Sequence, residues 1–158
     1  MLIRRLLLVL LLYGVGSTRG LAQEAVSDTV QLLPEQLRQF VYFNMPRQEF
    51  VKRLPHAREI SQRVSFRRVY IDQETDPPLD FMAFYFDKDN HEPLYEVILG
   101  FADTTTRNEL AAQLLGPPNY NGDEWYVPRD SAFDYSAWRY QNKLIIIGRI
   151  EGTEWAEE

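Results

Sequence analysis

Apolar residues recur at helical spacing in two short stretches of the chain. PRQEFVKRL, at 46–54, and TRNELAAQL, at 106–114, place apolar side chains at matching positions and fill most others with polar or charged residues. This spacing predicts an amphipathic helix over each stretch, with the apolar stripe facing the core. Pro46 suits the first helical position and Pro55 ends the first helix. The stripes are Phe50, Val51 and Leu54 in the first stretch and Leu110, Ala111 and Leu114 in the second.

The ends of the second helix carry their own signals. Thr106 and Glu109 have the spacing of a capping box, although Thr104 or Thr105 suits the N-cap position equally well. Gly116 and the two prolines that follow it prevent continuation of the helix. A less regular apolar pattern at 34–43 predicts a further short helix.

Elsewhere the chain is rich in β-branched and aromatic residues, and in places apolar positions alternate with a period of two, which predicts β-strands. The runs at 79–86 and 94–101 are separated by a short polar link, so they predict an antiparallel hairpin. The six predicted strands are 64–72, 79–86, 94–101, 125–127, 136–140 and 144–150.

The order of predicted elements is one helix and three strands, followed by the same again. At an offset of 60 the two helical stretches also have identical residues at three positions. These are Arg47 and Arg107, Glu49 and Glu109, and Leu54 and Leu114. We therefore predict an α+β fold built from two tandem α-β-β-β repeats, with the helices packed on one face of an antiparallel sheet. The predicted divisions are a signal peptide at 1–22, a flexible N-terminus at 23–34, repeats at 35–103 and 104–151, and an acidic, frayed tail at 152–158.

One motif resembles two known families. TRNELAAQLLGPP, at 106–118, with WRYQNKLIIIGRI, at 138–150, after it, resembles the modules of the beta-lactamase inhibitory protein. It is also similar to the single module of the small outer-membrane assembly lipoproteins. The resemblance implies helices layered on a continuous antiparallel sheet, and protein binding as the class of function. The chain departs from both families because it has neither their disulfides nor a cysteine that could carry a lipid, and no functional motif of either family falls on a residue here.

The N-terminal sequence has the three parts of a secretory signal. MLIRR is basic, the run at 6–16 is apolar, and STRGLA ends in small residues, which predicts cleavage between Ala22 and Gln23. A membrane anchor is the alternative, but the apolar run is shorter than the roughly 20 residues that a spanning helix needs. We expect an exported soluble protein, periplasmic or extracellular, with no transmembrane segment after cleavage.

Composition excludes several kinds of site. The absence of cysteine removes disulfides, thiolate zinc sites and thiol nucleophiles. The net charge of −6 argues against nucleic acid, whose binding depends on neutralising phosphates. The segment at 47–68 is basic against this trend, and we interpret it as a solvated face beside acidic neighbours rather than as a surface for an acidic partner.

Candidate chemistry is sparse. His56 and His91 lie in no recognisable nucleophile motif, and the cluster at 87–92 (DKDNHE) lacks the glycine and glutamate positions of a calcium loop. Asp and Asn favour turns, so we interpret that cluster as a hairpin turn. We predict no catalytic residue, no metal and no cofactor.

A sheet with helices on one face leaves its other face free to bind. We expect an inhibitor-like or envelope accessory protein that binds a protein partner through exposed aromatic residues on that face. One alternative is an enzyme that acts on a cell-envelope substrate through converging carboxylates with shifted pKa values. The other is a self-associating homodimer that pairs through an exposed edge strand at 144–150. The candidate contact residues are Tyr70, Tyr85, Tyr95, Trp125, Tyr126, Trp138 and Tyr140.

Overall fold

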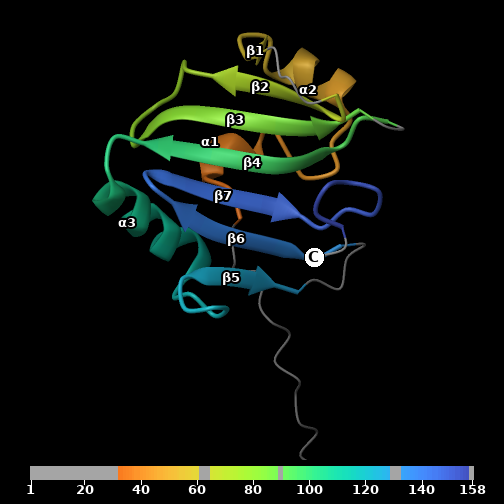
Figure 1. Cartoon of the computed structure of the whole chain (residues 1–158). Coiled ribbons are helices and arrows are strands. Elements are labelled where there is room, and N and C mark those ends of the chain that lie inside the picture. Colours follow the sequence, from red (N-terminus) through yellow and green to blue (C-terminus); the bar gives the residue numbers. More distant parts are fainter. Residues whose placement is uncertain (1–31, 61–64, 89–90, 129–132, 157–158) are drawn as a thin grey trace, which may run out of the picture.

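A seven-stranded antiparallel sheet runs through the described part of the chain, in the strand order β1-β2-β3-β4-β7-β6-β5 (Figure 1). Together with the helices it confirms the predicted α+β class, including the hairpin of β3 with β4. The strands are β1 (Arg58–Ile60), β2 (Arg67–Asp72), β3 (Leu79–Asp87), β4 (Leu94–Phe101), β5 (Glu124–Val127), β6 (Tyr135–Tyr140) and β7 (Lys143–Gly148).

The computed structural model of the chain describes residues 32–60, 65–88, 91–128 and 133–156. The expected signal peptide at 1–22 lies outside these ranges, as does most of the expected N-terminal segment at 23–34. Residues 32–34 of that segment are described, and Leu33 is buried in the core. The first residue of the strand predicted at 64–72 and part of the turn predicted at 87–92 also lie outside them.

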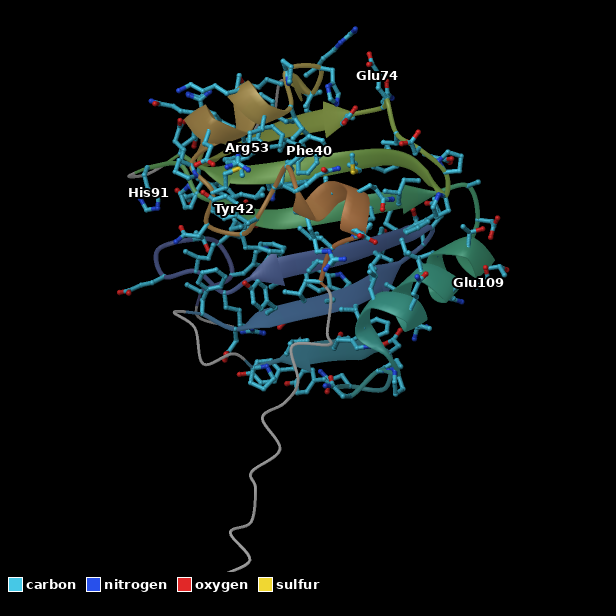
Figure 2. All side chains as sticks on the ribbon, turned by 180° about the vertical axis from the view of Figure 1, so that it is seen from behind. Phe40, Tyr42, Arg53, Glu74, His91 and Glu109 are labelled. Carbon is cyan, nitrogen blue, oxygen red and sulfur yellow. The ribbon has the colours of Figure 1, made fainter. Side chains whose placement is uncertain are left out.

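Three helices in the described residues contribute buried side chains to one face of the sheet. Figure 2 shows α1 and α2 in front of the sheet, with α3 beside them. The helix face therefore carries the main core, and the opposite side is the helix-free face. The helices are α1 (Glu35–Arg38), α2 (Arg47–Arg53) and α3 (Thr104–Leu115).

The start of α3 differs from the predicted capping box. Asp103 is the N-cap: its side chain accepts a 2.8 Å hydrogen bond from the Thr106 amide and a 3.0 Å bond from the Thr106 hydroxyl. The helix therefore begins before Thr106, because a carboxylate satisfies free amides at a helix N-terminus well. Gly116 ends the helix with φ of 71°, as the sequence predicts.

Phe50 is the centre of the packing between α2 and the sheet. Its ring lies 5.3 Å from that of Tyr70, 4.8 Å from that of Phe84 and 4.9 Å from that of Phe86, measured between centroids. Phe50 is fully buried, whereas the neighbouring Val51 is 40% exposed. The expectation that Val51 belongs to the apolar stripe was therefore wrong. The seven-residue helix α2 buries Phe50 against the sheet and leaves Val51 at the surface.

The tandem duplication is not confirmed. The strand order places the three strands after α3 in reverse order beside the strands that follow α2, with β4 and β7 in contact at the centre. This arrangement is compatible with a repeat, but the helices differ in length, at seven and twelve residues, and β1 adds a strand to the first half. The duplication stays a prediction.

The expected exposed edge at 144–150 was wrong. β7 ends at Gly148 and pairs with β4 on one side and β6 on the other, so it is a central strand. Within the described residues, the edges of the sheet are β1 and β5. A central strand is buried on both faces, which accounts for its continuous apolar sequence.

Replacing Phe50 with alanine should cost about 3–5 kcal/mol of unfolding free energy, because it leaves a cavity among three aromatic rings. Val51→Ala is the matched control and should change stability by less than about 1 kcal/mol. Urea unfolding followed by circular dichroism measures both variants. Equal losses at the two positions would contradict the packing of α2 described above.

Candidate functional site

The C-terminal segment, residues 149–156, folds back onto the helix-free face instead of fraying. The Tyr95 hydroxyl donates a 2.9 Å hydrogen bond to a Glu154 carboxylate oxygen. The Trp155 indole Nε1 donates a 3.1 Å bond to Glu96, and its ring lies 5.5 Å from that of Trp138 in an edge-to-face contact. The expectation of a frayed acidic tail was therefore wrong for residues 152–156, and 157–158 lie outside the described residues.

A register shift in β4 brings two polar groups under this segment. The pairing of β3 with β4 is irregular between Tyr85 and Phe86, so that Tyr95 has no direct partner while Glu96 pairs with Tyr85. A bulge of this kind lets two successive residues point to the same face. Tyr95 and Glu96 consequently both meet the C-terminal segment.

Glu96 is a buried carboxyl group on the helix-free face, only 6% exposed. Burial raises its pKa to about 7, and the nearby negative charge of Glu154 adds to the effect. The hydrogen bond from Trp155 and the positive charge of Arg67 act in the opposite direction. Arg67 itself donates a 3.0 Å bond to Glu154. One guanidinium is therefore hydrogen-bonded to Glu154 and also acts on Glu96 through its charge.

Three of the seven candidate aromatic residues are inside the protein. Tyr70 and Trp125 face the helices and are 5% and 2% exposed, and Tyr95 is fully buried beneath the C-terminal segment. The Trp125 indole donates a 3.1 Å bond to the Gly116 carbonyl, which ties β5 to the end of α3. The expectation that these three residues form an exposed patch is corrected, because their rings offer almost no surface.

The other four candidates lie on the helix-free face. The register puts Tyr126 in one row with Ser136 and Ile147, and Trp138 in the next row with Ile145. Tyr126 is 37% exposed and Tyr140 is 58% exposed. Tyr85 is half-buried, with the Arg67 guanidinium 5.0 Å from its ring centroid.

A hollow of about 210 Å³ opens between β5, β6 and the C-terminal segment. Its lining combines aromatic rings with a carboxylate and a guanidinium. The Arg149 Nε donates a 3.0 Å bond to the Ser136 hydroxyl, and Asn121 holds Glu124 through a 3.2 Å bond. We call it the aromatic groove and define it by Tyr120, Glu124, Ser136, Trp138, Arg149 and Trp155.

Two aromatic residues of the aromatic groove, Tyr120 and Trp155, were missed by the sequence-based prediction. Tyr120 is 53% exposed and its ring lies 6.4 Å from that of Tyr126. Trp155 comes from the segment that was expected to fray. A tryptophan isolated among acidic residues is a signal for a packed segment, since its large apolar surface favours burial.

Several arginines of the basic segment at 47–68 form ion pairs with acidic residues. Arg68 donates a 2.8 Å bond to Glu92, and Arg47 bonds the other oxygen of the same carboxylate. Burial opposes ionisation of Glu92, but the hydrogen bonds from both arginines lower its pKa overall. Glu92 is thus held by two arginines, which agrees with a structural role for this residue.

No family model, curated protein or solved structure matches the chain. The resemblance to the beta-lactamase inhibitory protein and to the assembly lipoproteins therefore stays a prediction based on the sequence pattern. Among the helices of the described residues, none has the length and apolar character to cross a membrane.

The burial of Glu96 predicts a dependence of stability on pH. Its pKa of about 7 in the folded protein lies above the ordinary value of 4.5, so the folded state binds the proton more tightly. The stabilisation is complete below about pH 4.5 and is lost as the pH rises through 7. It amounts to at most about 3 kcal/mol.

Glu96→Gln should remove this part of the pH dependence, because the amide stays neutral and still accepts the Trp155 hydrogen bond. The measurement is the unfolding free energy of both proteins from pH 5 to pH 8.5. Glu109→Gln, at an exposed position on α3, is the control and should keep the wild-type profile. A Glu96→Gln profile parallel to wild type would contradict the buried position of this carboxyl.

Proposed function

We propose that this chain is an exported, non-enzymatic binding protein that holds a protein partner on its helix-free face, at the aromatic groove. The observation that carries the proposal is the gathering of Tyr120, Trp138 and Trp155 around one hollow beside the exposed Tyr126. Tyrosine and tryptophan dominate the energetics of protein interfaces, since they bury large apolar areas and keep a polar atom for hydrogen bonding.

The size of the groove favours a protein side chain as its occupant. Its volume of about 210 Å³ is smaller than the roughly 300–1,000 Å³ typical of sites for whole small molecules. A side chain of a partner fills such a hollow while the surrounding face contacts the partner's surface. Glu124 and Arg149 on the wall supply charges of both signs that can orient the partner.

The polar atoms of edge strand β5 favour contact through side chains rather than through strand addition. Asn119 bonds both backbone groups of Tyr126, at 2.8 Å to the amide and 2.9 Å to the carbonyl. Tyr120 exchanges backbone hydrogen bonds with Glu124 at 3.0 Å. The chain thus caps its own edge, which limits pairing with another strand.

Photo-crosslinking tests this proposal. A benzophenone amino acid placed at Tyr126 should yield a discrete crosslinked protein in the cells that express the chain. The same group at Tyr42, which is 45% exposed and lies on the opposite face (Figure 2), is the matched control and should yield none.

Trp138→Ala should reduce the crosslinking yield from position 126 by about tenfold or more, as for a buried aromatic anchor of an interface. Phe40→Ala, on the helix-bearing face, should leave the yield unchanged. Equal crosslinking from Tyr42, or insensitivity of the Tyr126 product to Trp138→Ala, would contradict the proposal.

A further inference from the structure

A second and larger pocket lies on the helix-bearing face, away from the aromatic groove. It has a volume of about 370 Å³ and is enclosed by α1, the end of α2 and the loop between β2 and β3. Figure 2 shows Phe40 and Arg53 on this face, and Glu74 lies in the loop that follows β2. The volume lies within the range of roughly 300–1,000 Å³ that is typical of small-molecule sites.

The floor of the pocket is apolar. It is formed by side chains that also belong to the main core and are at most 8% exposed, while Phe40, at 41% exposed, stands at the rim. An apolar floor of this kind favours the body of an organic ligand by removing it from water. The floor residues are Leu37, Leu54, Leu79 and Met82.

A buried carboxylate forms part of the wall. Asp72 is the last residue of β2, pairs with Met82 across the sheet, and has a side chain that is 2% exposed. One of its oxygens lies 2.9 Å from His56 Nε2 and the other accepts a 2.9 Å bond from the Glu74 amide. A polar group so deep in the protein is costly unless it is hydrogen-bonded, and these two contacts meet that requirement.

The pocket lining contains negative charges that have no ion-pair partner among the described residues. Glu74 and Asp76 join Asp72 in the lining, and neither forms an ion pair with any described residue. Arg53 is the lining's only arginine or lysine, but its guanidinium is 2.5 Å from the Glu49 carboxylate and also bonds the Gln39 carbonyl. Its positive charge is therefore compensated on the side of α2, while the loop carboxylates are not.

We propose that this pocket binds a small organic cation, an amine with a short apolar body. The apolar part lies against the leucine and methionine floor, and the ammonium group lies among Asp72, Glu74 and Asp76. This site is independent of the proposed contact with a protein partner, because it is on the opposite face of the sheet and shares no residue with the aromatic groove.

The test uses three unbranched probes with six carbon atoms each: n-hexylammonium, n-hexanoate and hexan-1-ol. Titration followed by two-dimensional amide NMR should show saturable shifts around Glu74 and Leu79 with n-hexylammonium, with a dissociation constant of about 1 mM, typical of a ligand with so few atoms. Hexan-1-ol should bind more weakly and n-hexanoate should not bind. Equal binding of all three, preference for n-hexanoate, or no saturable shift would overturn the proposal.

Variants separate the role of charge from general effects. The double variant Glu74→Gln/Asp76→Asn should weaken n-hexylammonium binding about tenfold, because it removes two uncompensated charges at exposed loop positions where folding is little affected. Glu109→Gln/Glu151→Gln removes the same net charge at exposed positions outside the pocket and should leave binding unchanged. Equal loss in both double variants would overturn specific recognition.

Photo-crosslinking from Tyr126 should be the same in the Glu74→Gln/Asp76→Asn variant as in wild type. Failure of the cation site can therefore be distinguished from failure of the proposed protein contact.

Discussion

The antiparallel pairing of β4 with β7 is the contact on which the rest of the structure depends. It runs from Glu96 opposite Ile147 to Gly100 opposite Lys143 and joins the strands that follow α2 to those that follow α3. Without it the chain would present two smaller sheets, each with a further open edge. With it, one sheet carries all three described helices on a single face, which leaves the other face to be covered by something else.

The C-terminal segment covers only part of the helix-free face, and its position determines which part of that face stays accessible. It covers the centre of the sheet, where Tyr95 and Glu96 become buried, and leaves β5 and β6 accessible. Trp155 serves both purposes, because it bonds Glu96 beneath it and forms a wall of the aromatic groove beside it. The proposed binding site is therefore complete only when the last residues lie against the sheet.

The elements of the fold follow well from the sequence where local pattern determines them. The strands at 79–86 and 94–101 and the helix stop at Gly116 were predicted from alternation and from glycine chemistry, which are properties of a few neighbouring residues. The apolar strand at 144–150 was placed at an edge, although burial on both faces is typical of a central strand. Its partner β4 lies too far away in sequence for the local pattern to identify it.

The candidate site was less predictable, because it depends on contacts between distant residues. Alternation in a strand shows which side chains share a face but not which face the helices cover, so Tyr70 and Trp125 were grouped with residues of the opposite face. Trp155 and Glu96 are 59 residues apart, and no period in the sequence relates them. The same holds for the pocket on the helix-bearing face, where Asp72 and His56 meet only after β1 has paired with β2.

The position of the C-terminal segment is the central claim, and hydrogen exchange of the tryptophan indoles tests it directly. The Nε1 protons of Trp125 and Trp155 are both donated to acceptors inside the protein, at 3.1 Å. Their NMR signals should exchange with solvent much more slowly than that of Trp138, and Ala replacement of Glu96 should speed exchange at Trp155 alone. Exchange of the Trp155 indole at the rate of a free indole in the intact chain would contradict the account.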